Sequence, residues 1–374
     1  MSDTRRNVYT KMMKPSFVSI GTFVIGGAIF AAIIIGAVVV GESMKQGADT
    51  TLAPKDTPVV TVAATATLPA ATSSASIIST STIATTSTLS ISISPSQIIE
   101  GDPVMFTITG TSDANATIAN IKNVTVVAPG PNMAGRSDAT SLQFLTYKNV
   151  PIAFYGTGIN QATGTTTVTV TMKDGAKISG TFTIGKRFSP SEKLPVPAQL
   201  GGNSTSSQQQ LVTNLAAENA ALTNVYSNPN ISFWTSAFTW PIHASDVSGG
   251  IIITDPFGYN RNSGVETIIH KGSDFKAPVG TPVYAINAGY VRMARLFTVY
   301  GNTVVVDHGM GIQSFYMHLS KMSVTPGEAV KQGQLLGYSG ETGYSEGPHL
   351  HLTIRVGGVS IDPIKFYALF GVTP

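Results

Sequence analysis

The sequence predicts an all-β protein that carries one transmembrane helix near its N-terminus. Three observations predict this fold class. One uncharged apolar segment is long enough to cross a bilayer, several later segments alternate apolar and polar residues as half-buried strands do, and Gly-Asp-Pro and Lys-Asp-Gly turns lie among these segments. A chain of 374 residues exceeds the usual size of one compact domain. We therefore expect two or three domains.

The composition excludes several kinds of functional site. Cysteine is absent, so the chain has no disulfide, no thiolate metal site and no cysteine nucleophile, and any metal must be held by histidine or carboxylate side chains. The formal net charge is only +3. The basic residues are scattered and do not form the clusters with aromatic residues that nucleic-acid-binding proteins show. We expect no nucleic-acid partner.

Residues 17–40 predict a transmembrane anchor. The segment reads FVSIGTFVIGGAIFAAIIIGAVVV, contains no charged residue and exceeds the about 20 residues that cross a bilayer as a helix. Four basic residues precede it: Arg5, Arg6, Lys11 and Lys14. The positive-inside rule then predicts a cytoplasmic tail over residues 1–16 and a single-pass protein of the cell membrane whose C-terminal domains are extracytoplasmic. A cleaved signal peptide is the alternative, but its apolar region usually spans only about 7–15 residues.

The next segments predict a linker and a β domain. Residues 41–90 are rich in Ser and Thr, have too little apolar bulk for a core, and predict an extended stalk. Residues 91–186 alternate apolar and polar residues, and the Lys-Asp-Gly turn between TVTVTM and KISGTFTI indicates a hairpin. The pattern predicts about six or seven strands in a β-sandwich. It resembles the immunoglobulin-like modules of bacterial surface proteins, and we expect a spacer or a weak adhesion module.

Residues 187–240 predict a second linker that contains one helix. The stretch FSPSEKLPVPAQLGGNSTS is rich in Pro, Gly and Ser. The following SSQQQLVTNLAAENAALTNVY places apolar residues at helical spacing, which predicts a helix over residues 207–224. Ser207 is its expected N-cap.

The chemistry gathers in the last predicted domain, residues 241–374. All six histidines of the chain lie there: His243, His270, His308, His318, His349 and His351. GPHLHL places His349 and His351 two positions apart in an alternating segment, and side chains at that spacing leave a β-strand on the same face. Two neighbouring imidazoles are costly to bury unless they are hydrogen-bonded or bind a metal. The pair therefore indicates a functional site.

Two further motifs supply the rest of a metal site. IIHKGSDF offers His270 and Asp274, which we expect on a turn or a bulged strand, and FYMHLS offers His318. No HExxH motif is present, which excludes the common helical zinc-protease arrangement. A catalytic zinc needs three protein ligands and one open position. His270, Asp274 and one member of the His349/His351 pair meet that need, and they leave the other member and His318 for proton transfer.

In their order along the chain, the motifs HKGSDF, YGNTVVVDHG, FYMHLS and GPHLHL are similar to those of the LytM or lysostaphin-type zinc metalloendopeptidases, over residues 240–365. Members of that family cleave peptide bonds in bacterial peptidoglycan. The resemblance implies that His270, Asp274 and His351 hold one Zn²⁺ ion and that His318 and His349 are the catalytic pair. It also implies an antiparallel β domain of the biotinyl-barrel-like, duplicated hybrid motif type, with a groove across it.

The resemblance predicts a membrane-anchored, exported zinc metalloendopeptidase that hydrolyses peptidoglycan peptides in cell-wall remodelling or division. One alternative is a non-catalytic LytM-like regulator that activates other hydrolases, although all five site residues are present here. A second alternative is a wall-binding protein in which residues 91–186 are the active part. Tyr259 and Arg261 are candidate substrate contacts, with a loop-surface role as the alternative. His243 and His308 are expected to lie outside the catalytic site.

Overall fold

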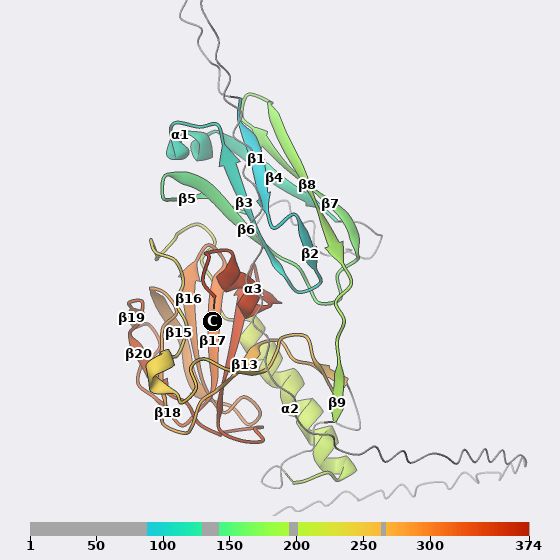
Figure 1. Ribbon diagram of the computed structural model, residues 1–374, viewed down its shortest axis with the longest axis vertical. Helices are drawn as coiled ribbons and strands as arrows, with labels where there is room; N and C mark the ends of the chain where they lie inside the picture. Colours follow the sequence, from blue (N-terminus) through green and yellow to red (C-terminus); the bar gives the residue numbers. More distant parts are fainter. Residues whose placement is uncertain (1–87, 129–141, 194–200, 263–266, 374) are drawn as a thin grey trace, which may run out of the picture. The chain divides into compact units, whose positions relative to one another are not determined.

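The computed structural model describes residues 88–128, 142–193, 201–262 and 267–373 (Figure 1). The predicted cytoplasmic tail and transmembrane anchor, and nearly all of the first linker, lie outside the described residues. Among the helices of the described residues, none combines the length and the apolar composition that a membrane span requires. The described part of the chain is mostly β-strand with few helices, as the sequence predicts.

Residues 90–185 form two four-stranded sheets (Figure 1). The first sheet has the order β1 (Ser90–Ser94), β3 (Pro103–Thr109), β6 (Val150–Gly156) and β5 (Leu145–Tyr147). The second has the order β2 (Gln97–Ile99), β8 (Lys177–Gly185), β7 (Gly164–Met172) and β4 (Ile121–Val127). A short helix, α1 (Ala114–Ala119), lies between β3 and β4 in the chain.

The two sheets share one apolar core. Strand β7 buries every second residue from its third position on, because its valines alternate with threonines and successive strand residues point to opposite faces. Val168 and Val170 of β7 pack in the same cluster as Phe106 of β3 and Phe182 of β8. Strands β7 and β8 pair antiparallel on either side of the Lys-Asp-Gly turn, so the expected hairpin is present. The immunoglobulin-like assignment of this sandwich stays a prediction.

The helix of the second linker begins earlier than expected. Helix α2 spans Thr205–Thr223, and its N-cap is Ser204, whose side chain accepts a hydrogen bond from the backbone N–H of Ser207. The prediction of Ser207 as the N-cap is wrong. Ser204 has the extended backbone of a cap residue, whereas Ser207 lies in the first turn and donates its hydroxyl to the carbonyl of Gly201.

An eight-stranded antiparallel sheet forms the centre of the C-terminal domain (Figure 1). Its order is β10 (Ile253–Asp255), β13 (Ser273–Lys276), β21 (His349–Val356), β17 (Ile312–Leu319), β16 (Asn302–Gly309), β15 (Gly289–Leu296) and β19 (Ala329–Val330), with β22 (Val359–Ile361) also paired to β21. A smaller sheet joins β14 (Pro282–Tyr284), β20 (Leu335–Tyr338) and β18 (Lys321–Met322). Another joins β12 (Thr267–Ile269), β11 (Asn260–Asn262) and β9 (Ser191–Lys193). Two short helical segments are η3 (Ala244–Asp246) and α3 (Pro363–Ala368).

Strand β21 has one face that packs in the apolar core and one face that carries polar side chains. Four of its residues belong to the main apolar core: Leu350, Leu352, Ile354 and Val356. The four that alternate with them leave on the opposite face: His349, His351, Thr353 and Arg355. The sequence HLHLTIRV therefore separates a packing face from a functional face within a single strand.

Helix α2 packs on the functional face of the sheet. Leu222 of α2 belongs to a buried cluster with Phe315 and Met317 of β17. At the end of the helix, the Arg355 guanidinium donates a hydrogen bond of 2.8 Å to the carbonyl of Leu222. A cation at this place also interacts favourably with the helix dipole. The helix is thus attached to the face that carries His349 and His351.

Glu218 of α2 holds the loop that connects β15 and β16. Its two carboxylate oxygens accept hydrogen bonds of 2.7–3.1 Å from the backbone N–H groups of Thr298, Val299 and Tyr300. The side chain is buried, and a buried carboxylate that accepts several N–H groups is much stronger as an acceptor than a neutral amide. The carbonyl of Tyr300 in turn accepts from the backbone N–H of His318, at 3.0 Å.

We expect a Glu218→Gln variant to lose about 1–3 kcal/mol of unfolding free energy, because an amide N–H₂ would face backbone N–H groups that need acceptors. Denaturant unfolding of both proteins measures this difference. Glu341→Gln is the matched control, since Glu341 is exposed and surface substitutions usually change stability by less than about 0.5 kcal/mol. An equal effect of the two substitutions would contradict the role given to Glu218.

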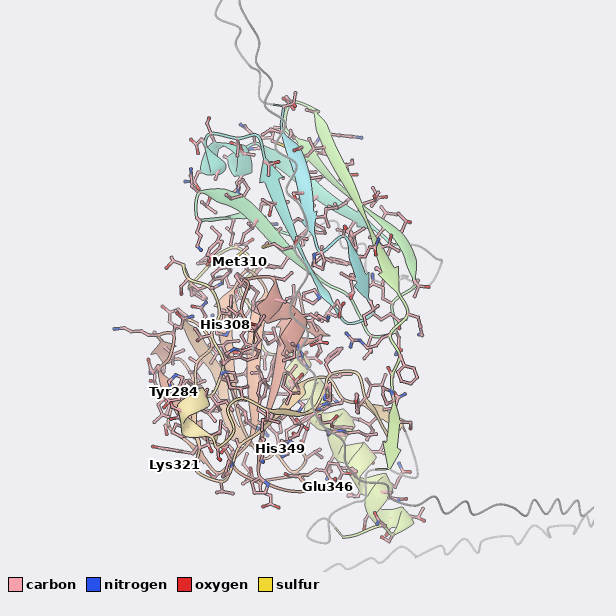
Figure 2. All side chains as sticks on the ribbon, in the orientation of Figure 1. Tyr284, His308, Met310, Lys321, Glu346 and His349 are labelled. Atoms are coloured by element: carbon pink, nitrogen blue, oxygen red, sulfur yellow. The ribbon has the colours of Figure 1, made fainter. Side chains whose placement is uncertain are left out.

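His308 is a structural residue of β16, away from His349 (Figure 2). It is fully buried, its Nδ1 lies 2.8 Å from the carbonyl of Ala288, and its Nε2 lies 2.7 Å from the hydroxyl of Ser314. Burial lowers the pKa of the His308 imidazole from 6.5 to about 4, against the opposing influence of the Ala288 carbonyl and Asp307. The ring is therefore neutral at physiological pH.

This pKa predicts a loss of stability in acid. Below pH 6.5 the unfolded chain binds a proton at His308, whereas the folded ring excludes that proton until about pH 4. The contribution is thus fully present above pH 6.5 and falls by about 1.4 kcal/mol for each pH unit toward pH 4. Unfolding free energies measured across this range should fall less steeply in a His308→Gln variant than in the wild type. Parallel curves would show that His308 does not contribute.

Candidate active site

Three neighbouring strands bring the site residues together. Strand β13 pairs with β21 so that Asp274 stands directly opposite His351, and β21 pairs with β17 so that Met317 stands opposite His351. His270 follows the end of β12 and precedes a short turn into β13. The structure therefore places His270 and Asp274 on a turn and the strand after it.

Gly272 makes this turn possible. A Cβ atom at this position would collide with the His351 ring and with the carbonyl of Leu352. Glycine alone lets the chain between His270 and Asp274 pass this close to β21. The spacing of the HKGSD motif thus has a steric cause.

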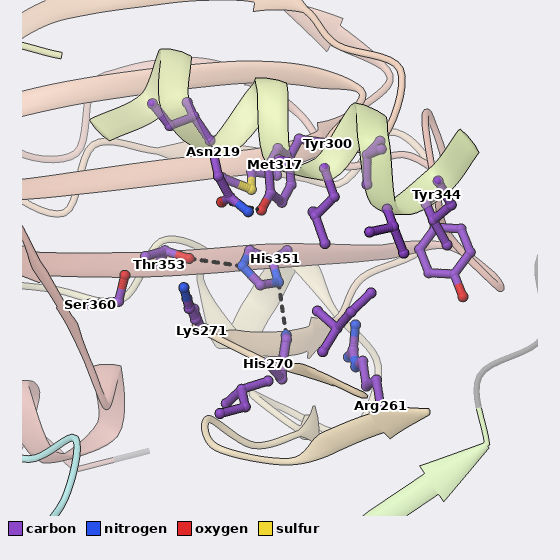
Figure 3. Close-up of a pocket in the computed structure, with 18 of the residues that line it drawn as sticks. Asn219, Arg261, His270, Lys271, Tyr300, Met317, Tyr344, His351, Thr353 and Ser360 are labelled. Atoms are coloured by element: carbon purple, nitrogen blue, oxygen red, sulfur yellow. Dashed lines mark hydrogen bonds between the residues drawn. The ribbon is translucent and has the colours of Figure 1, made fainter. Parts of the chain in front are cut away.

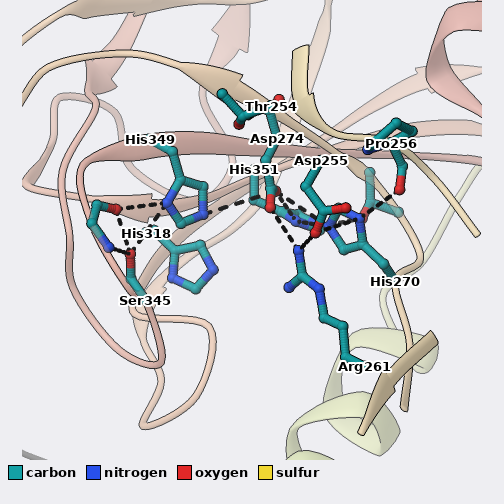
Figure 4. Close-up of polar contacts among 12 residues, drawn as sticks. Thr254, Asp255, Pro256, Arg261, His270, Asp274, His318, Ser345, His349 and His351 are labelled. Atoms are coloured by element: carbon teal, nitrogen blue, oxygen red, sulfur yellow. Dashed lines mark hydrogen bonds and ion pairs between the residues drawn. The ribbon is translucent and has the colours of Figure 1, made fainter. Parts of the chain in front are cut away.

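The three residues expected to bind metal converge on one point (Figure 4). Asp274 Oδ1 lies 2.8 Å from His351 Nδ1 and 3.2 Å from His270 Nε2, and the two ring nitrogens are 3.0 Å apart. Ligands of a tetrahedral zinc with bonds of about 2.0–2.1 Å are separated by about 3.3 Å. The donor set of two imidazoles and one carboxylate, at these separations, fits a zinc ion.

In each ligand histidine, the ring nitrogen that faces away from the metal site is hydrogen-bonded, and this bond orients the nitrogen that faces the site. His270 Nδ1 lies 3.0 Å from the carbonyl of Pro256. Because a carbonyl can only accept a hydrogen bond, Nδ1 carries the ring proton as the donor and Nε2 is left to bind a metal. His351 uses its other nitrogen, Nε2, on the Thr353 hydroxyl at 2.9 Å, which leaves Nδ1 for the metal. Such outer partners fix the tautomer and orientation of metal-ligating histidines.

Arg261 orients the carboxylate of Asp274. Its guanidinium donates to Asp274 Oδ2 at 2.8 Å and also pairs with the carboxylate of Asp255. Burial opposes ionisation of Asp274, but the charges and hydrogen bonds of His270 and His351 hold the pKa of its carboxyl well below the usual range. With Oδ2 on Arg261, the remaining oxygen Oδ1 faces the two imidazoles.

His318 and His349 form a second pair beside this cluster (Figure 4). Their ring centroids are 4.8 Å apart, and His349 Nε2 lies 3.8 Å from Asp274 Oδ1. The Nδ1 atoms lie 2.8 Å from the backbone carbonyls of Thr342 and Gly347, respectively. Both rings therefore carry their proton on Nδ1 when neutral and present a bare Nε2, as a proton acceptor needs.

A β-bulge aims His318 at the site. In the pairing of β16 with β17, Asn302 stands opposite Leu319 and Val304 opposite Tyr316, so Met317 and His318 share one partner position. His318 also has a φ of 61°, a conformation that costs a non-glycine residue about 1–3 kcal/mol. Regular alternation would place Met317 and His318 on opposite faces, and bulges next to active sites re-aim side chains in this way.

Burial keeps the inner histidines neutral. It lowers the pKa of His318 to about 3, with a further contribution from the charges of His349 and His351. It lowers the pKa of His351 to about 4, although Asp274 acts in the opposite direction. Neutral imidazoles are the form that binds a metal or accepts a proton.

The site opens into a pocket of about 410 Å³ beneath α2 (Figure 3). Its floor includes His270, His318 and His351, and its roof is formed by apolar residues of α2: Leu211, Val212, Leu215 and Ala216. A concave, mostly apolar pocket with a few convergent polar groups is the usual form of a ligand site. Three of the five predicted site residues thus line one cavity, and Asp274 and His349 lie beside them.

Other expectations for individual residues have mixed outcomes. Arg261 holds Asp274 and also lines the pocket, and the substrate contacts expected of Arg261 and Tyr259 stay predictions. His243 lies outside the cluster, stacked on Tyr284 with 4.2 Å between ring centroids.

Sequence reasoning missed two residues: Glu218, which accepts the backbone N–H of Val299, and Thr342, whose carbonyl holds His318 Nδ1. Each contact joins residues 24 or more positions apart, so no local pattern in the sequence indicates it.

Comparison with known families agrees with this geometry. Residues 268–363, which include all five site residues, match the model of Peptidase family M23. This part of the chain is an M23 metallopeptidase domain, and the resemblance to LytM and lysostaphin-type enzymes is confirmed.

Two curated relatives and one solved structure illustrate the similarity. The chain is 45% identical over 96 residues to the peptidoglycan DD-endopeptidase ShyA of Vibrio cholerae serotype O1, covering 26% of this chain and 22% of that protein. It is 39% identical over 114 residues to the DD-carboxypeptidase/endopeptidase Mpg of Neisseria meningitidis serogroup B, covering 30% and 26%. The structure of lysostaphin from Staphylococcus simulans has 35% identity and a TM-score of 0.29, covering 32% of this chain and 50% of that one. The chain thus spans 22–26% of the length of these two curated relatives.

Proposed function

We propose that this protein is a zinc metalloendopeptidase that hydrolyses peptide bonds in bacterial peptidoglycan. The observation that carries the proposal is the cluster of His270, Asp274 and His351, whose donor atoms lie within 3.2 Å of one another. A second pair, His318 and His349, stands beside it, and the Nδ1 atom of each ring is hydrogen-bonded to a backbone carbonyl. Three ligands plus a nearby proton acceptor are the minimum for metal-assisted amide hydrolysis.

His270 Nε2, Asp274 Oδ1 and His351 Nδ1 would hold one zinc ion. The chemistry that zinc supplies when bound is polarisation of the scissile carbonyl and activation of a water molecule. Asp274 contributes a permanent negative charge, because its carboxyl stays ionised. Arg261, Pro256 and Thr353 keep the three ligand atoms in place from the outer side.

His318 and His349 would move the protons of the reaction. One Nε2 accepts the proton of the attacking water, and the imidazolium so formed can donate that proton to the leaving amine. The other ring can stabilise the developing oxyanion once it carries a proton on its own Nε2. The carbonyls of Thr342 and Gly347 hold both rings in the tautomer that this exchange needs.

The substrate class is supported by the relatives. ShyA is named a peptidoglycan DD-endopeptidase and Mpg a DD-carboxypeptidase/endopeptidase. We extend this substrate class to the present chain, with a role in wall remodelling or division.

The proposed location is the outer side of the cell membrane. The apolar segment 17–40 supports a single-pass anchor, the basic residues before it support a cytoplasmic N-terminus, and residues 41–90 would serve as a stalk. The membrane is the proposed contact of the N-terminal helix, and peptidoglycan peptides are the proposed partner of the catalytic domain.

The proposal is tested by incubating the purified full-length chain with peptidoglycan, with and without a chelator, and identifying the released fragments by mass. Peptide-bond cleavage that the chelator abolishes and added zinc restores is the expected result. Intact peptidoglycan in all samples would favour the non-catalytic regulator instead.

A further inference from the structure

The pocket beneath α2 is rich in positive charge. Three cationic side chains line it: Arg261, Lys271 and Arg355. Among the described residues that line it, none is an aspartate or a glutamate. A second pocket of about 440 Å³ also includes Lys271 and Arg355, again without a carboxylate among its described lining residues. Arg261 is paired with Asp255 and Asp274, which leaves Lys271 and Arg355 as the charges that no described carboxylate balances.

Arg355 is held in place but keeps donor capacity. Its guanidinium lies over the Phe315 ring at 4.4 Å from the centroid, and its Nη1 donates to the carbonyl of Leu222 at 2.8 Å. The side chain is buried, and among the described residues no acceptor bonds to its Nη2. Its Nε donates to the Ser360 hydroxyl at 3.4 Å, so the donors left for an anion are those of Nη2 and the second N–H of Nη1.

Lys271 brings the second charge to the same place. It follows the proposed ligand His270 directly, and its amine projects toward the strand that carries His351 and Thr353 (Figure 3). No described side chain forms an ion pair with it. The Lys271 amine is therefore a cation beside the reacting centre that the folded chain does not itself neutralise.

We propose that Lys271 and Arg355 form a carboxylate-binding subsite that selects peptides carrying a free carboxylate close to the scissile bond. The inference rests on the proposed function and names the substrate feature that the site prefers. His351 and Arg355 are four positions apart on β21, which corresponds to about 13 Å or about four residues of an extended peptide. The carboxylate would thus lie within a few residues of the bond that is cut. Arg355 is buried whereas Lys271 is exposed, so the anion would lie between a desolvated guanidinium and a solvated amine. Hydrogen bonds between such charged groups are about twice as strong as those between neutral groups.

The test compares two cross-linked wall peptides that differ only in their carboxylates, which are free in one and converted to primary amides in the other. The zinc-loaded full-length chain should cleave the free acid with a kcat/KM about tenfold or more above that of the amide, mainly through a lower KM. Lys271→Met should bring this ratio close to one. Lys271→Arg, which keeps the charge, should retain most of the preference.

Lys331→Met is the matched control, since Lys331 is an exposed lysine of the same domain outside both pockets. It should keep the wild-type ratio. Equal cleavage of the two peptides by the wild type, or an unchanged ratio in Lys271→Met, would overturn the proposed subsite while leaving the peptidase function intact.

A binding measurement separates this inference from the proposed function. The free-acid and amidated product peptides are titrated calorimetrically into the wild type in the presence of a chelator, so that no cleavage is needed. If neither substrate is cleaved, the proposed function fails, yet a tenfold preference for the free-acid product still supports the subsite. Equal binding of both products overturns it.

Discussion

A His351→Ala variant is expected to lose both zinc and peptide cleavage, and Asp274→Ala is expected to do the same. Each substitution removes one of the three donor atoms that lie within 3.2 Å of one another. Loss of a partner that merely orients a ligand reduces metal affinity or activity by about 10–100-fold, so loss of a ligand itself should exceed about 100-fold. Metal analysis of the purified variants and kcat/KM on cross-linked wall peptides measure the two effects.

His243→Ala is the control for these ligand variants. His243 is a largely exposed histidine of the same domain, stacked on Tyr284 and away from the cluster. It should keep the zinc content and the activity of the wild type. A His351→Ala variant that retained zinc and cleaved at the wild-type rate would contradict the proposed ligand set.

Substitution of either member of the second pair should separate metal binding from catalysis. His318→Ala and His349→Ala are expected to keep zinc and to lose about 10²–10⁴-fold in kcat, the usual contribution of a positioned proton-transfer group. The reason is that neither ring is needed to complete the ligand cluster, whereas both present a bare Nε2 beside it. Zinc content and single-turnover cleavage should be measured on the same preparation.

The backbone of His318 gives a further prediction about stability. His318 adopts a positive φ within a bulge, so a His318→Gly variant should relieve backbone strain and unfold at a higher denaturant concentration than His318→Ala, although both lack the ring. Wild-type cleavage by either alanine variant with bound zinc would refute the assignment of the catalytic pair.

Much of the site could be predicted because it follows from local pattern. The alternation in HLHLTIRV placed His349 and His351 on one face, and the structure shows this division along β21. The turn between His270 and Asp274 was expected from the glycine in HKGSD, and Gly272 indeed lies against His351. Both features depend on neighbours in sequence, which a strand or turn pattern records.

His318 shows where local pattern fails. Strict alternation in FYMHLS predicts opposite faces for Met317 and His318, yet both line the same pocket. The bulge that reverses the direction of His318 arises from the pairing of β17 with β16, and the sequence of β17 alone does not contain that pairing. The resemblance to known enzymes supplied the role of His318, and the structure supplies the cause.

The contacts that Arg261 and Glu218 make could not be predicted from the sequence for a related reason. Arg261 meets Asp274 only because a separate small sheet places β11 near β13. Glu218 meets Val299 across 81 positions of chain. Long-range contacts of single polar side chains leave no periodic signal. The predicted anchor at residues 17–40 lies outside the described residues and stays a prediction.

The position of Glu218 has a consequence for how this chain can be divided. The match to the family model begins at residue 268, but the carboxylate that fixes the Thr298–Tyr300 loop belongs to a helix that ends at Thr223. A protein cut to residues 268–363 would keep every catalytic side chain and expose Phe315 and Met317 to water. The segment that matches the family model is therefore shorter than the segment that must fold together. Transfer of the catalytic domain to another protein should include helix α2 as well as residues 268–363.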